Sequence, residues 1–160
     1  MKPKNFNLNI KNDETWLTPP SLLKKLGPFD LDPCASNPRP WDSAKKHYSL
    51  PLDGLALPWE GRVFLNPPYG KKTFLWLEKL STHPGGGIAL IFARTETIGF
   101  FNTVWNKANS ILFIKGRIKF LSIDGLERGA ANAPSCLISY TKSDSFKLKC
   151  SNIDGKLIYL

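Results

Sequence analysis

The sequence predicts an α/β fold built around an open, mostly parallel β-sheet with an antiparallel edge. Short apolar runs alternate along the chain with segments whose apolar residues recur at helical spacing, and this alternation is typical of such folds. The run GGGIALIFA (85–93) is almost entirely apolar, as expected for a parallel strand that is covered on both faces. The chain has 160 residues, a hydrophobic content of 42% and a charged content of 22%, which together predict one globular domain.

The N-terminal part of the chain is predicted to contain a helix and a series of short strands. Residues 1–14 are polar and are expected to form a flexible arm, so that the domain spans residues 15–160. Pro19-Pro20 can open a helix over SLLKKL (21–26), which Gly27-Pro28 would end. The short apolar runs interpreted as strands are FDLD (29–32), one near HYSL (47–50), and RVFLN (62–66).

The C-terminal part is predicted to alternate helix and strand before it closes with a hairpin. The alternating segments, in the order helix, strand, helix and strand, are 72–83, 85–93, 98–108 and 110–116. RIKF (117–120) and APSCLISY (133–140) are predicted to pair as a terminal antiparallel hairpin. The connection between them, LSIDGLERGAAN (121–132), is rich in small and polar residues and is predicted to be a mobile loop.

The net charge points to a polyanionic partner. The chain carries 22 Lys and Arg residues against 13 Asp and Glu residues, which gives a formal charge of +9 and a pI near 9.6. A basic surface releases counterions when it neutralises phosphates, so nucleic acid is the favoured partner. A soluble basic surface without such a partner is the alternative.

Composition argues against membranes, secretion and metal ions. No apolar run approaches the ~20 residues that span a bilayer, and the N-terminus lacks the apolar core of a secretory signal. We therefore expect a cytoplasmic protein without a membrane partner. Cys34, Cys136, Cys150, His47 and His83 are isolated from one another in the sequence, so no metal site is expected.

Two predicted strands end in residues that carry chemistry. The strand at 29–32 closes with Asp32, and an acidic residue at such an end can bind a ligand amine or hydroxyl; its alternative is a simple Asp-Pro turn. The strand at 62–66 runs into Asn66-Pro67-Pro68-Tyr69, where neither proline can donate to a sheet. Ligands bind at the carboxyl ends of strands in open α/β sheets, which makes both ends candidate site segments.

The combination of motifs resembles the phage-type DNA N6-adenine methyltransferases, a group of the S-adenosylmethionine-dependent amino methyltransferases. Asn66 to Tyr69 match the catalytic tetrapeptide Asp/Asn/Ser-Pro-Pro-Tyr/Phe of that class. The matching segments follow the family's order: TWLTPPSLL (15–23), FDLDPCAS (29–36), LDGLALPWEGRVFLNPPYG (52–70), ALIFARTET (89–97), KGRIKF (115–120) and APSCLISY (133–140). The resemblance implies a Rossmann-like class I methyltransferase fold with helices on both faces of the sheet. It also implies a site-specific, phage- or prophage-encoded enzyme that methylates adenine N6 in double-stranded DNA.

The resemblance assigns catalytic roles to Asn66, Pro67, Pro68 and Tyr69. The side-chain oxygen of Asn66 and the carbonyl of Pro67 would accept the two hydrogens of the adenine amino group. That amino group is conjugated with its ring and is therefore a poor nucleophile. Its lone pair must be turned towards the methyl donor before it can react. The two prolines would keep the acceptors rigid, and Tyr69 would stack on a base flipped out of the duplex.

The cofactor implied by the resemblance is S-adenosyl-L-methionine. Its candidate ligands lie in three segments: Thr18 and Pro19; Asp32, Pro33, Cys34 and Ala35; and Asp53 and Gly54. The alternative for Asp53 is a structural turn. DPCAS departs from the glycine-rich loop of broader methyltransferases, and Asp42 is the candidate for the acidic residue that binds the ribose.

The candidate DNA contacts are basic residues: Lys71, Lys72, Arg117 and Arg128. For the two lysines the alternative is a solvated helix start. Two other functions stay open, namely a catalytically weak or inactive DNA-binding protein of the same fold and a protein glutamine N5-methyltransferase. A separate target-recognition domain does not fit beside the core at this length, so loops would read the DNA. A monomer or a weak dimer is expected.

Overall fold

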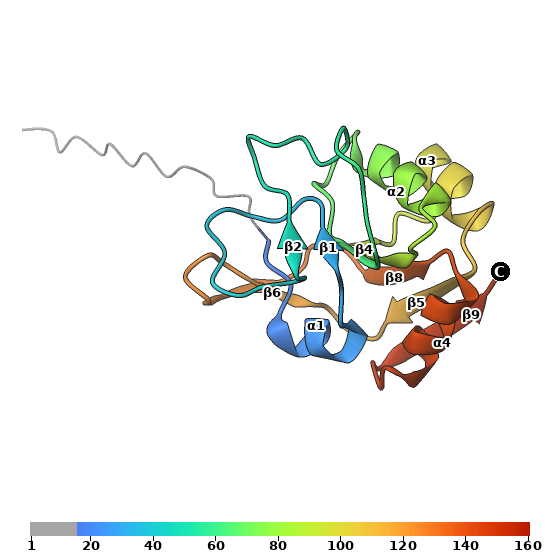
Figure 1. Cartoon of the computed structure of the whole chain (residues 1–160). Helices are drawn as coiled ribbons and strands as arrows, with labels where there is room; N and C mark the ends of the chain where they lie inside the picture. The colour runs from blue at the N-terminus through green and yellow to red at the C-terminus, as the bar shows by residue number, and fades with distance from the viewer. Residues whose placement is uncertain (1–15) are drawn as a thin grey trace, which may run out of the picture.

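The computed structural model describes residues 16–160, apart from the side chain of Arg128, and is built around a seven-stranded sheet (Figure 1). The strand order is β2-β1-β3-β4-β8-β5-β9. The strands are β1 (Leu31–Asp32), β2 (Lys46–His47), β3 (Val63–Leu65), β4 (Gly87–Phe92), β5 (Ser110–Ile114), β8 (Ser135–Ser139) and β9 (Gly155–Tyr159). The pairings from β2 to β4 are parallel, whereas β8 is antiparallel to β4 and β5, and β9 is antiparallel to β5. The sheet is therefore mostly parallel, since β8 and β9 alone oppose the other described strands.

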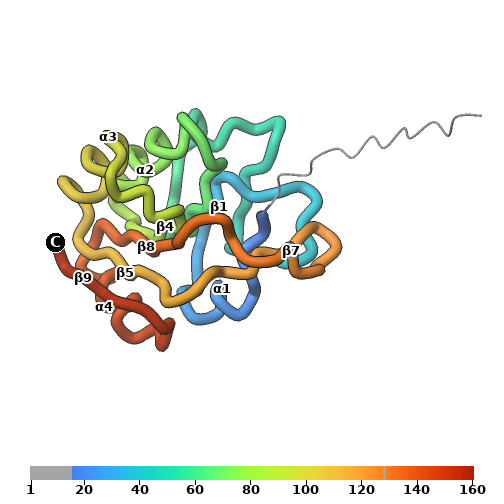
Figure 2. The backbone as a smooth tube through the Cα atoms, turned by 180° about the vertical axis from the view of Figure 1, so that it is seen from behind, coloured from blue at the N-terminus to red at the C-terminus, as the bar shows by residue number. Residues whose placement is uncertain are grey.

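Helices cover both faces of the sheet (Figures 1 and 2). One face carries α2 (Thr73–Thr82), α3 (Ile98–Phe100) and a π-helical segment, η1 (Phe101–Trp105), and the other carries α1 (Pro20–Leu26) and α4 (Lys142–Cys150). Side chains alternate along β3, so that Val63 and Leu65 join the core under α2 whereas Phe64 joins the core under α1 and α4. Within residues 16–160, no helix is both long and apolar enough to span a bilayer.

The helices and strands predicted between residues 21 and 116 are confirmed, mostly in shorter form. The prediction of a hairpin between residues 117–120 and 133–140 is wrong. β8 lies inside the sheet between β4 and β5, because all of its residues are buried and it pairs on both sides. The hairpin that does form pairs β6 (Lys119–Leu121) with β7 (Glu127–Ala130) in a separate two-stranded sheet. The predicted antiparallel edge is present, but it consists of β5 and β9.

Other parts of the C-terminal region also differ from the sequence prediction. β7 lies within residues 121–132, so the loop predicted there is partly a strand. The turn between β6 and β7 is closed by hydrogen bonds from the backbone N–H groups of Ser122 and Gly125. α4 and β9 were not expected from the sequence pattern. The predicted N-terminal arm, residues 1–14, lies outside the described residues.

The carboxyl ends of β1 and β3 form the switch point of the sheet. From β1 the chain reaches β2 on one side and then returns to β3 on the other side. Leu31 pairs with Val63, which places Asp32 and the residues after Leu65 at the same edge. Open α/β sheets bind ligands in the crevice at such a point.

A buried ion pair anchors the start of β3. Arg62 donates from Nε to Asp144 Oδ1 at 2.7 Å and from Nη1 to the carbonyls of Leu26 and Pro28 at 2.8 Å. The second carboxylate oxygen of Asp144 accepts from the backbone N–H of Gly87 at 2.8 Å. These bonds tie β3 to α1, β4 and α4, and they thereby fix the strand that leads into the Pro-Pro turn.

Candidate active site

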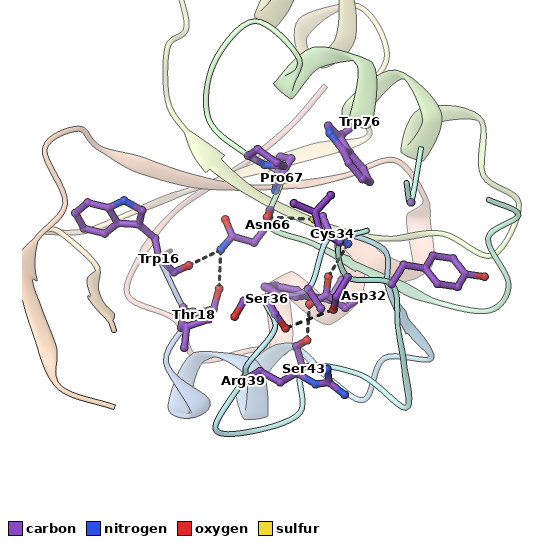
Figure 3. Close-up of a pocket in the computed structure, with 18 of the residues that line it drawn as sticks. Trp16, Thr18, Asp32, Cys34, Ser36, Arg39, Ser43, Asn66, Pro67 and Trp76 are labelled. Atoms are coloured by element: carbon purple, nitrogen blue, oxygen red, sulfur yellow. Dashed lines mark hydrogen bonds between the residues drawn. The ribbon is translucent and has the colours of Figure 1, made fainter. Parts of the chain in front are cut away.

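A cavity of about 350 Å³ opens at the carboxyl ends of β1 and β3 (Figure 3). The residues of its lining that the sequence had indicated are Thr18, Asp32, Cys34, Ala35, Asp53, Gly54, Asn66, Pro67, Pro68 and Tyr69. They come from the segment before α1, the loop after β1, the loop after β2 and the turn after β3. The structure therefore brings the predicted cofactor segments and the predicted catalytic turn together around one cavity.

Two predicted cofactor residues lie beside the cavity rather than in its lining. Pro19 is the N-cap of α1 and lines a separate groove. Pro33 is buried, and its carbonyl oxygen lies only 1.8 Å from the position that a Cβ on Gly54 would occupy. A glycine at position 54 is thus required for the loops after β1 and β2 to approach each other. Asp53 Oδ1 accepts from the backbone N–H of Leu55 at 2.9 Å, so Asp53 also stabilises its own turn.

Asp32 places a buried carboxylate in the cavity, with 5% of the residue exposed. Its Oδ1 accepts from the backbone N–H of Cys34 at 3.1 Å, and its Oδ2 accepts from the hydroxyl of Ser43. Burial raises the pKa of Asp32 to about 6, although these hydrogen bonds act in the opposite direction. The carboxylate is therefore ionised at neutral pH and can meet a cationic or hydroxyl group of a ligand.

Asn66 is bonded to the segment before α1 and to the loop after β1 (Figure 3). Its Nδ2 donates to the backbone carbonyl of Trp16 at 3.1 Å and to Oγ1 of Thr18 at 3.2 Å. Its Oδ1 accepts from the hydroxyl of Tyr69 at 3.3 Å, and its backbone carbonyl accepts from the thiol of Cys34 at 3.2 Å. Burial raises the pKa of that thiol well above its ordinary value and so keeps it protonated as a donor.

The remainder of the turn is held by the start of α2. Thr73 Oγ1 donates to the carbonyl of Pro68 at 2.8 Å and accepts from the backbone N–H of Gly70 at 3.1 Å. In the part of the chain that the structure describes, no hydrogen bond engages the carbonyl of Pro67. The acceptor capacity of that carbonyl is therefore unused within the described part of the chain.

The ring of Tyr69 stacks on Phe92, with ring centroids 4.1 Å apart and planes 8° from parallel. Burial raises the pKa of Tyr69, so its hydroxyl stays neutral. Because Phe92 covers one face of the ring, a base that stacked on Tyr69 would use the opposite face.

Sequence reasoning missed several groups around the cavity: the carbonyl of Trp16, the hydroxyl of Ser43 and the side chain of Arg39. Ser43 and Arg39 lie in the loop of residues 33–45, which has no periodicity to indicate the side chains that turn inward. Trp16 acts through its main chain, which no residue type reveals. Asp42, the candidate ribose ligand, pairs with Arg39 at 3.1 Å and is not part of the cavity lining.

The predicted DNA contacts lie in different places. Lys71 and Lys72 are exposed directly after the turn, and Lys72 is the N-cap of α2. Arg117 is exposed and lines the separate groove between α1 and the β6–β7 hairpin. The side chain of Arg128 lies outside what the structure describes. The two lysines therefore directly follow the turn that lines the cavity, whereas Arg117 lines another depression.

The potential metal ligands are dispersed. Cys34 lines the cavity, Cys136 is buried in β8, and Cys150 is exposed at the end of α4. Among residues 16–160, no group of three or more His, Cys, Asp and Glu side chains could hold a metal ion.

A mostly parallel sheet with a ligand-sized cavity at its switch point is typical of proteins that bind an organic cofactor. The sequence matches the family described as DNA N-6-adenine-methyltransferase (Dam) over residues 6–152, and the chain belongs to that family. Comparison with curated proteins and with solved structures yields no match. The resemblance predicted from the motifs is thus confirmed at the level of the family.

Proposed function

We propose that the protein is an S-adenosyl-L-methionine-dependent enzyme that methylates the N6 amino group of adenine in double-stranded DNA. Membership of the family supports this class of reaction. The observation that carries the proposal is the meeting of two strand ends in one cavity, with Asp32 after β1 and the Asn66–Tyr69 turn after β3. The proposal includes a Rossmann-like class I methyltransferase domain over residues 15–160 and a phage-encoded enzyme that works in the cytoplasm of a bacterial host.

The cavity suits S-adenosyl-L-methionine in size and chemistry. Organic ligands occupy cavities of roughly 300–1,000 Å³ with apolar walls and a few polar groups, and this cavity measures about 350 Å³. The ionised carboxylate of Asp32 suits a ligand that carries ammonium and sulfonium charges. The ring of Trp76 and the side chains of Leu50 and Leu52 provide apolar walls for its adenine ring. When bound, this cofactor supplies the methyl group.

The turn provides the acceptors for the adenine amino group. Asn66 Oδ1 and the carbonyl of Pro67 accept its two hydrogens, and this turns the nitrogen lone pair towards the methyl donor. The adjacent prolines hold both acceptors rigidly, and positioning of this kind lowers a barrier by up to ~7–11 kcal/mol. The ring of Tyr69, backed by Phe92, offers a stacking surface worth ~1–3 kcal/mol to a base flipped out of the duplex.

Transfer of a tritium-labelled methyl group tests the proposal. The protein is incubated in parallel with double-stranded DNA, a protein mixture and tRNA, and the products are digested to nucleosides and amino acids. We expect label in DNA, recovered as N6-methyldeoxyadenosine. Label recovered as N5-methylglutamine would instead assign the glutamine reaction. DNA binding without label in any substrate would show a catalytically inactive protein.

The lysines after the turn are expected to contact phosphates of bound DNA. Replacing Lys71 and Lys72 together by alanine should weaken DNA binding and reduce the slope of log K against log salt concentration by about 1.8, since each phosphate contact contributes about 0.9. Cofactor affinity and melting temperature should not change, because both side chains are exposed. Fluorescence anisotropy of labelled duplex DNA over a salt series measures the slope.

A matched control replaces two exposed lysines of α4, Lys147 and Lys149, by alanine. α4 packs near β5 and β9, at the other end of the sheet from β1 (Figure 1). This control should keep the slope of the unmodified protein. An equal loss of slope in both double variants would indicate diffuse attraction and contradict a specific contact at the turn.

A further inference from the structure

The side-chain amide of Asn66 has one chemically allowed orientation. The Trp16 carbonyl, 3.1 Å away, can only accept a hydrogen bond, so the group that faces it must be the NH₂ of Asn66. The opposite orientation would set two carbonyl oxygens against each other. The second hydrogen of Nδ2 is taken by Oγ1 of Thr18 at 3.2 Å, which leaves Oδ1 as the end of the amide that neither Trp16 nor Thr18 engages.

The oxygen of this amide keeps acceptor capacity. Its partner, the hydroxyl of Tyr69, lies at 3.3 Å, which is long for an O–H···O hydrogen bond. A carbonyl oxygen has two lone pairs, so Asn66 Oδ1 can accept a further hydrogen bond from a substrate in the cavity that it lines.

We infer that Thr18, together with the main chain of Trp16, is a positioning residue that holds Asn66 in the orientation presenting its oxygen to the adenine amino group. This inference rests on the proposed function. The resemblance places Thr18 beside the methionine end of the cofactor, whereas in the structure its hydroxyl accepts a hydrogen bond from Asn66 and so acts through that residue.

The segment that holds Asn66 is itself fixed on two sides. Thr18 is buried, with 5% of the residue exposed, and its carbonyl accepts from Trp41 Nε1 at 3.2 Å. Leu17 exchanges two backbone hydrogen bonds with Leu121 of β6, at 2.9 and 3.0 Å. The orientation of the catalytic amide is therefore tied to the loop after β1 and to the β6–β7 hairpin.

This arrangement predicts that asparagine and aspartate at position 66 differ in their ability to support catalysis. Motif comparison treats the two as equal acceptors, since related tetrapeptides begin with either residue. In the Asn66→Asp variant, an ionised carboxylate would place an oxygen against the carbonyl of Trp16, with no hydrogen to give. A protonated acid could donate to that carbonyl and still accept from the amino group through its other oxygen. Asn66→Asp should therefore work better as the pH falls.

The first experiment compares Thr18→Val, which keeps the shape of the side chain, with Thr18→Ser, which keeps its hydroxyl. We expect Thr18→Val to lower kcat by about 10- to 100-fold, because a small misplacement of a positioned group costs up to about 100-fold. Its cofactor Kd should stay within about twofold of the unmodified value, and Thr18→Ser should restore most of the activity. Thr103→Val is the matched control, because Thr103 is equally buried but its hydroxyl donates to Gly99 in the helical layer.

The results that overturn the inference are specific. If Thr18→Val weakened cofactor binding and kept kcat, Thr18 would serve the cofactor alone. If Thr18→Ser were as inactive as Thr18→Val while both melted like the unmodified protein, the hydroxyl would not be the group that matters. Loss of activity in Thr103→Val to the same extent would indicate a general effect of removing a buried hydroxyl.

The second experiment does not depend on catalysis. In protein labelled with nitrogen-15 asparagine, the side-chain NH₂ signals of Asn66 are identified by their absence in Asn66→Asp. We expect these protons to exchange slowly with water and to exchange about tenfold faster in Thr18→Val, where one hydrogen bond is lost. Rapid exchange in the unmodified protein would contradict the inference, even if that protein transferred no methyl group and the proposed function failed.

The third experiment follows the activity of Asn66→Asp with pH, relative to the unmodified enzyme. The titratable residues that contact Asn66 are Cys34 and Tyr69. The other titratable or charged residues that line the same cavity are Asp32, Arg39, Tyr48 and Asp53. Burial raises the pKa of Asp32 to about 6 and raises those of the thiol and the phenol, and all three groups are common to both proteins. The activity ratio of variant to unmodified enzyme should rise as the pH falls. A ratio that is independent of pH would contradict the need for a donor at this position.

Discussion

Asn66→Ala is expected to lower methyl transfer to adenine by at least about 100-fold, because removal of one preorganised polar group at a reacting centre typically costs about 10²–10³-fold in turnover. The fold should change little. Asn66 is only half-buried, and its backbone bond from the thiol of Cys34 persists in the variant. The lost side-chain hydrogen bonds should reduce the free energy of unfolding by only about 1–2 kcal/mol. Single-turnover transfer, calorimetric cofactor affinity and thermal denaturation measure these effects separately.

The control for this prediction is Asn106→Ala, which removes an exposed amide at the end of the π-helical segment. This variant should transfer methyl groups at the rate of the unmodified protein. If Asn66 only stabilised the turn, the activity of Asn66→Ala would follow its folded fraction, and its cofactor affinity would fall in parallel. Full turnover by a folded Asn66→Ala variant would contradict the catalytic assignment.

The first part of the sheet can be predicted from sequence because its signals are local. The strand at 85–93 is an unbroken apolar run, and the helix at 72–83 has apolar residues at helical spacing. The position of β8 depends on which strands flank it, and an apolar run alone cannot distinguish a hairpin arm from a central strand. Its neighbours β4 and β5 precede it by many residues, so the pairing is a long-range choice.

α4 illustrates a helix that forms for reasons other than an apolar stripe. Within Lys142–Cys150 only Asp144, Ser145 and Leu148 are buried, so the segment has little amphipathic signal. Thr141 caps its N-terminus by accepting from the backbone N–H of Asp144, and Asp144 is held by the distant guanidinium of Arg62. A polar partner far away in the sequence thus contributes to holding the helix in place.

In the candidate site, too, some features can be predicted from the sequence and others cannot. A motif can be recognised where the residue type itself carries the chemistry, as in the Asn66–Tyr69 turn or the acidic strand end at Asp32. Gly54 was indicated by the motif, but the reason for it, the approach of the Pro33 carbonyl, is a contact between two loops. The orientation of Asn66 depends on a main-chain carbonyl, which any residue at position 16 would supply.

Asp32→Asn is expected to weaken cofactor binding by about 10- to 150-fold at neutral pH, which corresponds to the ~1.5–3 kcal/mol of a hydrogen bond to a charged group. The substitution removes charge with little other change. An asparagine oxygen can accept from the backbone N–H of Cys34, and its amide can donate to the hydroxyl of Ser43. Isothermal titration with S-adenosyl-L-methionine or its demethylated product measures the loss.

The same substitution is expected to stabilise the ligand-free protein. Burial raises the pKa of Asp32 from 3.8 to about 6, so the folded state holds this proton more tightly than the unfolded chain. The contribution of this group to stability is complete below about pH 4 and is lost as the pH rises through about 6. A pKa difference of this size corresponds to a change in the free energy of unfolding on the order of 3 kcal/mol. Asp32→Asn should therefore melt at a higher temperature than the unmodified protein at neutral pH.

The pH dependence of cofactor affinity distinguishes a ligand carboxylate from a structural one. In the unmodified protein the affinity should fall by up to about tenfold per pH unit below about pH 6, as Asp32 becomes protonated. His47 pairs in register with Asp32, and burial lowers its pKa, so it also titrates below its usual range. Asp32→Asn keeps His47, and any pH dependence that persists in the variant belongs to groups other than the Asp32 carboxylate. Cofactor affinity and a pH profile equal to those of the unmodified protein would show that the Asp32 carboxylate does not bind the cofactor.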